Sequence, residues 1–201
     1  MGKSLAVAVT GGIGSGKSEF CGFLSEKGFP VIQADKKAKE ILIKDESVRK
    51  KIISAFGKGA YSDSGVNTAF LAEKVFSNPE GVDKINSIVH PVVIKEIGDE
   101  IKEFSKKSKY VFVEAALIYE AAMEEMFDYV VLITAPVETR LKRVLQKGKM
   151  TEEDVRKRME NQIPDEEKKE WADFSFENNL GLDELKKKAD FLITLLNLVA
   201  V

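Results

Sequence analysis

The sequence has little of the residue types that build disulfides and metal clusters. Cys21 is the only cysteine and His90 the only histidine in 201 residues. An intrachain disulfide, a cysteine metal cage and a multi-histidine zinc site are therefore excluded. Basic and acidic residues nearly balance, at 31 and 33, so the chain lacks a polybasic field for nucleic acid. We expect no nucleic-acid partner, and any phosphate binding must be local.

Long hydrophobic runs are also missing. No stretch approaches the ~18 consecutive apolar residues of a membrane span, so no membrane partner is expected. The first apolar run is short and leads directly into a glycine-rich loop, so we expect a cytoplasmic protein without a signal peptide. With 44% hydrophobic and 32% charged residues, the composition is that of a globular chain with one core and elaborations on it.

The strongest motif follows that first run. Residues 11–18 read Gly-Gly-Ile-Gly-Ser-Gly-Lys-Ser, which fits a P-loop, with an apolar strand pattern before it and a helical pattern after it. Glycines let backbone N–H groups approach phosphate oxygens, and the following helix N-terminus favours an anion. The motif predicts binding of a nucleoside triphosphate with Mg²⁺, in which Lys17 reaches the β/γ-phosphates and the Ser18 hydroxyl is a Mg²⁺ ligand. The predicted nucleotide-binding residues here are Gly12, Ile13, Gly14, Ser15, Gly16, Lys17 and Ser18.

Hydrophobic patterning predicts an α/β fold. Runs such as Val130-Val131-Leu132-Ile133 are typical of strands covered on both faces, which indicates a parallel sheet between helices. The expected strands are 5–10, 30–34, 110–117, 129–134 and, with a weaker pattern, 173–177. The expected helices are 19–27, 36–43, 47–56, 68–75, 79–89, 91–107, 137–148, 151–162 and 182–199. A break is placed at His90 because Pro91 disfavours a helical residue before it.

Two helical segments interrupt this predicted sheet. The first, residues 36–88, carries a polar turn at 61–67; the second, residues 138–169, is dense in charge. We interpret the chain as a single domain, 1–201, with a core of about 1–35, 89–137 and 170–201. The segment 36–88 would be a substrate-binding insertion and 138–169 a lid, an arrangement that suits a kinase.

Asp35 is the leading candidate for a catalytic base. It follows the second expected strand at the edge where open α/β sheets place ligands, and its carboxylate could accept a proton from an acceptor hydroxyl. The alternative is that Asp35 caps the helix expected from Lys36, and the two roles are compatible.

Arginines of the expected lid are the second candidate group. Arg140 and Arg143 lie three residues apart on one helix face, where positive charge could stabilise a transferred phosphoryl group; Arg158 is a further candidate. The alternative is that these charges are simply solvated.

The residues also bear on the class of reaction. The guanine-reading Asn/Thr-Lys-x-Asp signature of GTPases is absent, and strand 110–117 does not end in paired Asp-Glu as in many hydrolytic ATPases. Phosphoryl transfer to a small acceptor is favoured. Another P-loop kinase of nucleoside monophosphates or small metabolites, and an ATP-binding regulator without transfer activity, are the alternatives.

An ordered set of motifs resembles the dephospho-coenzyme A kinase family over essentially the whole chain. After the P-loop the matches are Gln33-Ala34-Asp35, Leu71 with Val75-Phe76, Ile88-Val89-His90-Pro91, Leu117 to Glu120, Thr139-Arg140-Leu141 with Arg143, Arg158 with Gln162, and Ala172-Asp173 with Asn178.

The resemblance implies a P-loop kinase with a five-stranded parallel sheet that phosphorylates the 3′-hydroxyl of dephospho-coenzyme A with ATP. It implies Asp35 as the base, Asn178 at the adenine, and Arg140 and Arg143 in the lid; a monomer or weak homo-oligomer is expected. His90 would be on the substrate side, where the alternative is packing at a proline-fixed helix start. Glu114 could orient magnesium-bound water on that side.

The sequence departs from the family pattern at four positions. Gln33 replaces the first Asp of Asp-Ala-Asp, and Glu114 begins Glu-Ala-Ala-Leu-Ile where Asp-x-Pro-Leu-Leu is usual. Thr68 follows Gly65-Val66-Asn67 in place of the usual Arg, and Glu19 replaces a threonine after the P-loop.

Overall fold

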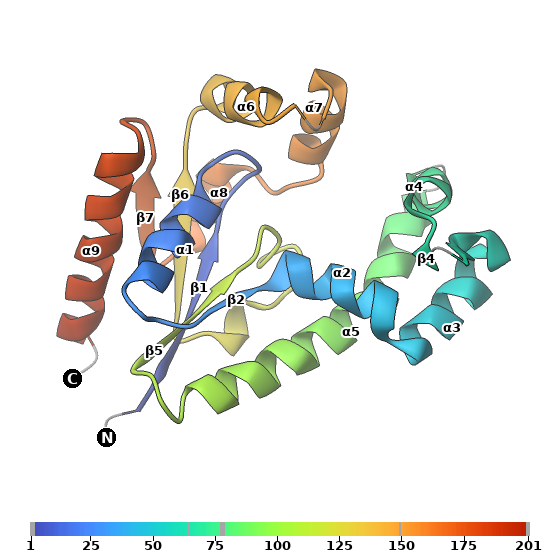
Figure 1. Cartoon of the computed structure of the whole chain (residues 1–201). Helices are drawn as coiled ribbons and strands as arrows, with labels where there is room; N and C mark the ends of the chain where they lie inside the picture. The colour runs from blue at the N-terminus through green and yellow to red at the C-terminus, as the bar shows by residue number, and fades with distance from the viewer. Residues whose placement is uncertain (1–2, 64, 77–78, 149, 200–201) are drawn as a thin grey trace. The chain divides into compact units, whose positions relative to one another are not determined.

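The computed structural model describes residues 3–63, 65–76, 79–148 and 150–199. They form two compact units, one of Ala34–Asp99 and the other of the remaining described residues. Figure 1 labels the strands and helices. The strands are β1 (Leu5–Thr10), β2 (Val31–Gln33), β3 (Tyr61–Ser62), β4 (Gly65–Val66), β5 (Tyr110–Glu114), β6 (Tyr129–Thr134) and β7 (Phe174–Glu177). The helices are α1 (Lys17–Glu26), α2 (Ala34–Lys44), α3 (Glu46–Phe56), η1 (Lys58–Ala60), α4 (Thr68–Phe76), α5 (Pro79–Phe104), η2 (Glu124–Met126), α6 (Val137–Gln146), α7 (Glu152–Glu160), α8 (Asp165–Trp171) and α9 (Leu182–Val199).

A five-stranded sheet of order β2-β5-β1-β6-β7 is the centre of the first unit. All four strand pairings are parallel, which confirms the predicted parallel sheet (Figure 1). Every residue of β1 and β5 is buried, as expected for strands covered on both faces. Val9 and Gln33 both pair with Glu114, so the carboxyl ends of β1, β2 and β5 meet at one edge of the sheet.

One face of the sheet packs against α1 and α9. Phe20 and Leu24 of α1 and Leu192 of α9 are fully buried, and they share one apolar cluster with Val7 and Val9 of β1. The ring of Phe20 stacks on Phe176 of β7 at 5.9 Å between centroids. The predicted C-terminal helix is confirmed, and its residues Leu185, Ala189, Leu192 and Leu196 are buried at three- and four-residue steps, while Leu182 and Val199 at its two ends are exposed. Cys21 is buried in the same cluster, and burial raises the pKa of its thiol well above the usual value.

The predicted helix break at His90 is wrong. Helix α5 runs without interruption past Pro91. Val89, Val93 and Ile97, at four-residue steps on either side of the proline, are all buried. The preference of a pre-proline residue for extended backbone is modest, and the packing of this continuous apolar stripe outweighs it.

Several element ends also differ from prediction. Strand β5 stops at Glu114 rather than at 117, and β2 stops at Gln33, so that α2 begins at Ala34. The polar turn expected at 61–67 contains the short antiparallel pair β3–β4. Helix α8 was not predicted, because its sequence, Asp-Glu-Glu-Lys-Lys-Glu-Trp, has no continuous apolar stripe.

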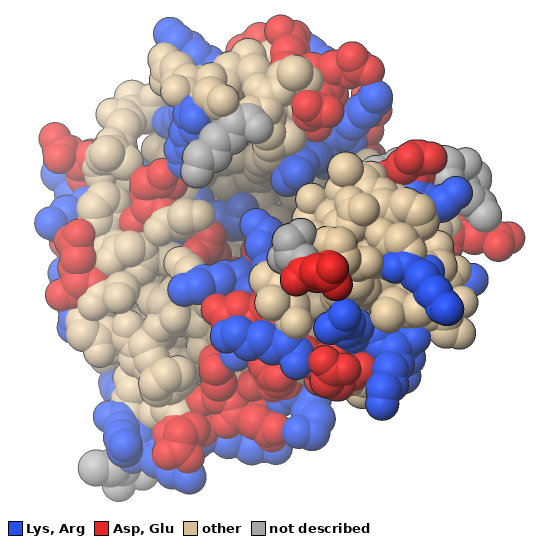
Figure 2. All heavy atoms as spheres, turned by 45° about the vertical axis from the view of Figure 1, so that its right-hand side comes forward, with Lys and Arg blue, Asp and Glu red and all other residues tan. Residues whose placement is uncertain are grey.

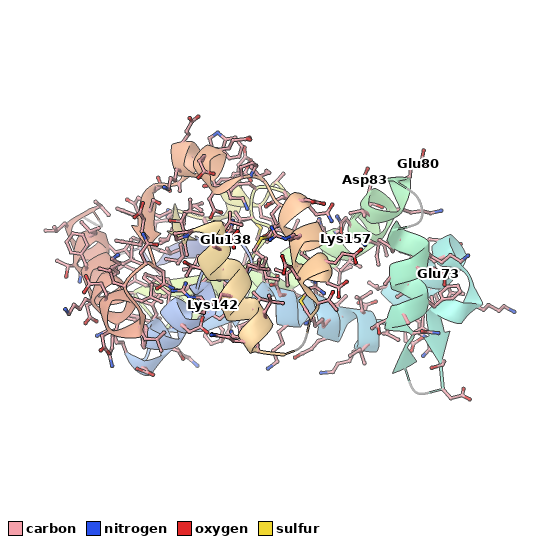
Figure 3. The ribbon with its side chains drawn as sticks, turned by 90° about the horizontal axis from the view of Figure 1, so that it is seen from above. Glu73, Glu80, Asp83, Glu138, Lys142 and Lys157 are labelled. Carbon is pink, nitrogen blue, oxygen red and sulfur yellow. The ribbon has the colours of Figure 1, made fainter. Side chains whose placement is uncertain are left out.

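The unit Ala34–Asp99 is helical apart from that short pair. Asp45 caps α3, accepting a hydrogen bond from the amide of Val48 at 2.8 Å. The hydroxyl of Tyr61 donates to the carbonyl of Leu42 at 2.8 Å, which ties β3 to α2. Glu73 of α4 and Glu80 and Asp83 of α5 lie on exposed positions of these helices (Figure 3).

Charged side chains of both signs are interspersed on the face that Figure 2 presents. Some form helix-surface pairs, such as Lys157 with Glu153 at 2.8 Å and Arg156 with Glu152 at 2.7 Å. Within the described residues, no helix combines the length and apolar composition that crossing a membrane requires.

Candidate active site

The glycine-rich loop lies between β1 and α1, as the sequence predicts. Gly14 and Gly16 adopt φ of 81° and 101°, in the left-handed region that favours glycine. A Cβ at Gly14 would lie 2.5 Å from the carbonyl oxygen of Arg140, so the loop is in close contact with α6. Gly16 is the residue before α1, and Lys17 and Ser18 form the first turn of the helix. The loop therefore has the strand–glycine turn–helix geometry of a phosphate cradle.

A cavity of about 560 Å³ opens beside this loop. Three segments that are distant in sequence form its walls: the loop with the first turn of α1, helix α6 with the chain just after it, and the segment from the end of β7 to the start of α9. Its lining residues are Ile13, Gly14, Gly16, Lys17, Ser18, Glu19, Arg143, Val144, Gln146, Lys147, Met150, Asn178, Gly181 and Leu182. A cavity of this size beside a phosphate cradle suits a nucleotide.

Ser18 and Glu114 are in direct contact. The Ser18 hydroxyl donates a hydrogen bond to Glu114 Oε1 at 2.5 Å, and Glu114 is buried at the end of β5. The hydroxyl keeps its lone pairs, and the carboxylate has a second oxygen. These are hard oxygen donors of the kind that Mg²⁺ prefers. Within the described residues, no group of three or more His, Cys, Asp or Glu side chains could hold a metal alone, so phosphate and water ligands would have to complete the shell.

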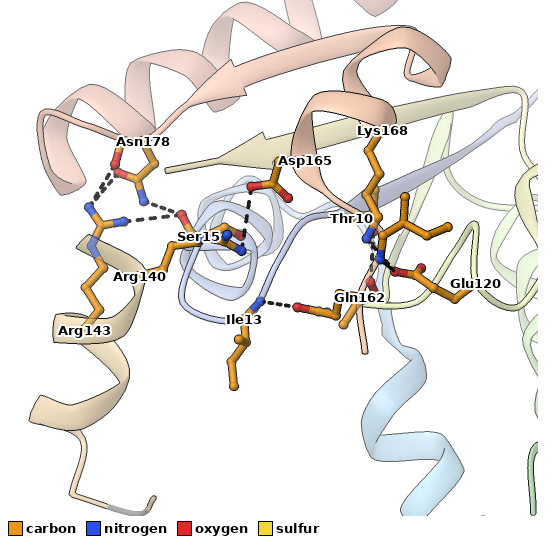
Figure 4. Close-up of polar contacts among 12 residues, drawn as sticks. Thr10, Ile13, Ser15, Glu120, Arg140, Arg143, Gln162, Asp165, Lys168 and Asn178 are labelled. Carbon is orange, nitrogen blue, oxygen red and sulfur yellow. Dashed lines mark hydrogen bonds and ion pairs between the residues drawn. The ribbon is translucent and has the colours of Figure 1, made fainter. Parts of the chain in front are cut away.

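Arg143 connects helix α6 to the loop and to the residue that follows β7. Its guanidinium donates to the carbonyl oxygen of Asn178 at 2.9 Å and to that of Ser15 at 3.5 Å. The Asn178 amide donates to the same Ser15 carbonyl at 2.8 Å (Figure 4). Two predicted nucleotide-binding residues from separate segments therefore meet at the P-loop.

Arg140, one turn earlier on α6, is buried against the first half of the loop. Its side chain is close enough to Gly12 that any Cβ there would overlap the guanidinium. Arg140 NH1 lies 3.7 Å from Asp165 Oδ2, and Arg140 Nε has no hydrogen-bond partner among the described residues. The alternative of a solvated charge is therefore wrong for Arg140, which is 9% exposed. Glu138 and Lys142, on exposed positions of the same helix, are labelled in Figure 3.

Two further residues lie against the loop, one from the segment between α7 and α8 and one from the start of α8. Gln162 Oε1 accepts a hydrogen bond from the Ile13 amide at 3.0 Å (Figure 4). Asp165 lies beside Gly12, with its Oδ1 3.5 Å from where a Cβ of that residue would be. Burial raises the pKa of the Asp165 carboxyl, and the positive charges of Arg140 and Lys168 oppose that rise.

A buried ion pair holds the start of α8. Lys168 Nζ lies 2.7 Å from Glu120 Oε1, and the Lys168 side chain is 0% exposed. The same carboxylate oxygen accepts a hydrogen bond from the Ile163 amide at 2.9 Å. Glu120 therefore fixes both the segment before α8 and the helix itself to the chain that follows β5.

Asp35 and His90 lie in the other compact unit. Helix α2 begins at Ala34, so Asp35 is an exposed residue of its first turn and does not cap a helix from Lys36. His90 lies within α5 rather than at a helix start, and burial lowers the pKa of its imidazole.

Asp165 and Lys168 are site residues that the sequence pattern did not predict. Both lie in a stretch where charged residues outnumber apolar ones, so nothing in the pattern distinguishes them from solvated neighbours such as Glu166 and Glu167. Gln162 and Glu120 belong to the motifs shared with the family, but no role in the site was predicted for them.

The parallel sheet, the P-loop after β1 and the arginine-bearing helix above it define the class: this is a P-loop kinase fold. The family model for dephospho-CoA kinase matches residues 5–184. The chain belongs to the dephospho-CoA kinase family.

Individual relatives agree with this assignment. A dephospho-CoA kinase of Chlorobium luteolum is 36% identical over 94% of this chain and 90% of its own length. Among solved structures, dephospho-CoA kinase from Campylobacter jejuni is 31% identical, with a TM-score of 0.71 over 94% of this chain and 95% of that one. The Thermus thermophilus protein TT1252 is 29% identical, with a TM-score of 0.83 over 96% of this chain and 98% of that one.

Proposed function

We propose that this protein is a dephospho-CoA kinase that transfers the γ-phosphoryl group of ATP to the 3′-hydroxyl of dephospho-coenzyme A. The products are coenzyme A and ADP, in the final step of coenzyme A biosynthesis. The observation that carries the proposal is the convergence of Arg140, Arg143 and Asn178 on the P-loop of a chain that belongs to this family.

The P-loop and the lid would bind ATP, the phosphoryl donor. Backbone amides of residues 12–18 would bind the phosphates, and Lys17 would place a positive charge at the β/γ-phosphates. Arg140, buried with an unused Nε donor, would stabilise the charge on the transferred group. Arg143 and Asn178, which line the same cavity, would also contact the nucleotide.

Mg²⁺ fits the two oxygen-bearing side chains at the end of β5 and the start of α1. Ser18 would be the direct ligand, and Glu114 would orient water in the metal's shell through the contact that it makes with Ser18. When bound, the ion would neutralise phosphate charge, which lowers the cost of bringing an acceptor hydroxyl close to the triphosphate.

The acceptor side is assigned to Asp35, His90 and Glu114. We propose Asp35 as the base that orients the acceptor hydroxyl or takes its proton; its exposed carboxylate follows β2 by two residues in the chain. We further propose one domain, 1–201, with 36–88 as the substrate-binding insertion and 138–169 as the lid. The working form would be a cytoplasmic monomer or weak homo-oligomer.

An acceptor screen tests this function. Purified protein with ATP and Mg²⁺ is offered dephospho-coenzyme A, the nucleoside monophosphates and shikimate, and ADP release is measured together with the phosphorylated product. We expect acceptor-dependent release with dephospho-coenzyme A alone. Preferential transfer to a nucleoside monophosphate, or ATP binding with no transfer to any acceptor, would contradict the proposal.

A further inference from the structure

Side chains from a distant part of the chain contact the backbone of the first half of the P-loop. The Ile13 amide donates to Gln162, which precedes α8, and Asp165, the first residue of α8, lies beside Gly12. In a nucleotide site, amides of this loop are the donors that phosphate oxygens use. These two side chains therefore constrain the backbone of the loop at the place where it would bind a triphosphate.

Asp165 makes a second contact that Gln162 does not. Its carboxylate faces the Arg140 guanidinium at 3.7 Å, and the side chains of Arg140 and Asp165 are 11% and 9% exposed. Burying a charge is costly unless an opposite charge or a hydrogen bond compensates. Asp165 supplies that compensation, yet Arg140 Nε has no partner among the described residues. The arginine is therefore held in place while its Nε–H group remains available to donate a hydrogen bond.

The segment that carries Asp165 is itself anchored. Glu120 binds both the Ile163 amide and the Lys168 ammonium, on either side of Asp165 in the chain. Figure 4 shows these contacts with those of Gln162 and Arg140 around the loop. Asp165 is therefore presented from a fixed backbone and not from a mobile surface helix.

We propose that Asp165 is the positioning residue for Arg140 in phosphoryl transfer. Its negative charge orients the guanidinium over the loop, so that the arginine meets the triphosphate without reorganising. This role rests on the proposed function, because it acts through the arginine assigned there to the transferred group. Asp165 itself is not assigned any contact with substrate.

A double-mutant cycle in nucleotide binding tests the proposal. Asp165→Asn keeps a side-chain oxygen but removes the charge that faces Arg140. The affinity for a non-hydrolysable ATP analogue with Mg²⁺ is measured by calorimetry in wild type, Asp165→Asn, Arg140→Gln and the double variant. Glu167→Gln, which removes an exposed charge from the same helix, is the control and should bind and turn over as wild type does.

The direction of the effect is diagnostic. Removing a negative charge near a triphosphate by itself strengthens binding, whereas loss of a positioned arginine weakens it. We expect Asp165→Asn to bind roughly threefold to tenfold more weakly, with no further loss in the Arg140→Gln background. The kcat with dephospho-coenzyme A should fall by roughly tenfold in Asp165→Asn. The thermal unfolding midpoint should fall as well, because the buried Arg140 loses its negative partner, so binding and kcat are measured well below that midpoint.

Tighter or unchanged binding in Asp165→Asn would overturn the proposal, and so would losses that add fully in the double variant. A purely structural role would appear as a loss of nucleotide binding in Asp165→Asn that has the same size in the Arg140→Gln background. If wild type fails to phosphorylate dephospho-coenzyme A, the proposed function is contradicted, and the binding cycle still decides the role of Asp165.

Discussion

The buried pair of Lys168 and Glu120 gives the sharpest stability prediction. Lys168 is 0% exposed, and its ammonium lies 2.7 Å from Glu120 Oε1. Lys168→Met keeps an unbranched side chain of similar length but leaves the Glu120 carboxylate without its positive partner. Breaking a buried pair by removing one member costs about 3–5 kcal/mol of unfolding free energy.

That cost is large for a protein of this size. A typical domain has a total stability of about 5–15 kcal/mol. For chains of 150–250 residues, each kcal/mol shifts the melting temperature by about 2–4 °C, so Lys168→Met should lower it by roughly 6–20 °C. Urea unfolding, followed by circular dichroism, gives the free-energy change directly.

Two further variants complete the experiment. The double variant Lys168→Met/Glu120→Gln removes both charges and keeps an acceptor for the Ile163 amide, so it should be more stable than Lys168→Met alone. Lys169→Met is the control, because Lys169 lies on the exposed side of α8 with only a 3.6 Å surface pair to Glu177. That change should cost less than about 1 kcal/mol. The reasoning would be refuted if the unfolding free energy of Lys168→Met lay within about 1 kcal/mol of wild type, or if the double variant were no more stable than Lys168→Met.

Three other predictions concern the site. Lys17→Ala should keep the fold, as judged by its melting temperature, and lose roughly 10²-fold or more in kcat, because a charge at the developing phosphoryl group is removed; undiminished kcat would contradict the P-loop assignment. Asp35→Asn should lose roughly 10²–10⁴-fold in kcat with little change in stability, and undiminished transfer would show that Asp35 is not the base. Proton NMR should follow the single histidine without overlap and give His90 a pKa below 6.5, because burial disfavours the charged imidazole. The folded state then binds that proton less well than the unfolded chain, so the free energy of unfolding should fall as pH drops below 6.5 towards the folded pKa. His90→Gln should reduce this fall. A His90 pKa at or above 6.5 would contradict the predicted direction of the shift.

The parallel sheet and the P-loop could be predicted because their signals are local. The apolar runs that form β1 and β6 are contiguous, and the loop motif is eight consecutive residues between a strand and a helix. The backbone conformation of Gly14 and Gly16 follows from the motif, since other residues are strained there.

Boundaries were less predictable where local preferences and packing disagree. Pro91 indicated a helix end, but the buried stripe of Val89, Val93 and Ile97 continues through it, and packing prevailed. Helix α8 was not predicted for the opposite reason. Its sequence is that of an exposed, charged helix, although the charged residues Asp165 and Lys168 are buried. Charge that is paired across the fold has no periodic apolar signature in the sequence.

The sequence by itself determined the phosphate cradle, the order of strands and helices that supports it, and the candidate residues of the site. Only the tertiary structure decided which of these residues meet. Ser18 contacts Glu114 across 96 positions, Ile13 contacts Gln162 across 149, and Asn178 contacts Ser15 across 163. The physical reason is that hydrogen bonds and buried ion pairs are chosen by distance in the folded chain, which depends on how the strands are ordered in the sheet. The partner of Arg140 was therefore invisible in the sequence, although the arginine itself was not.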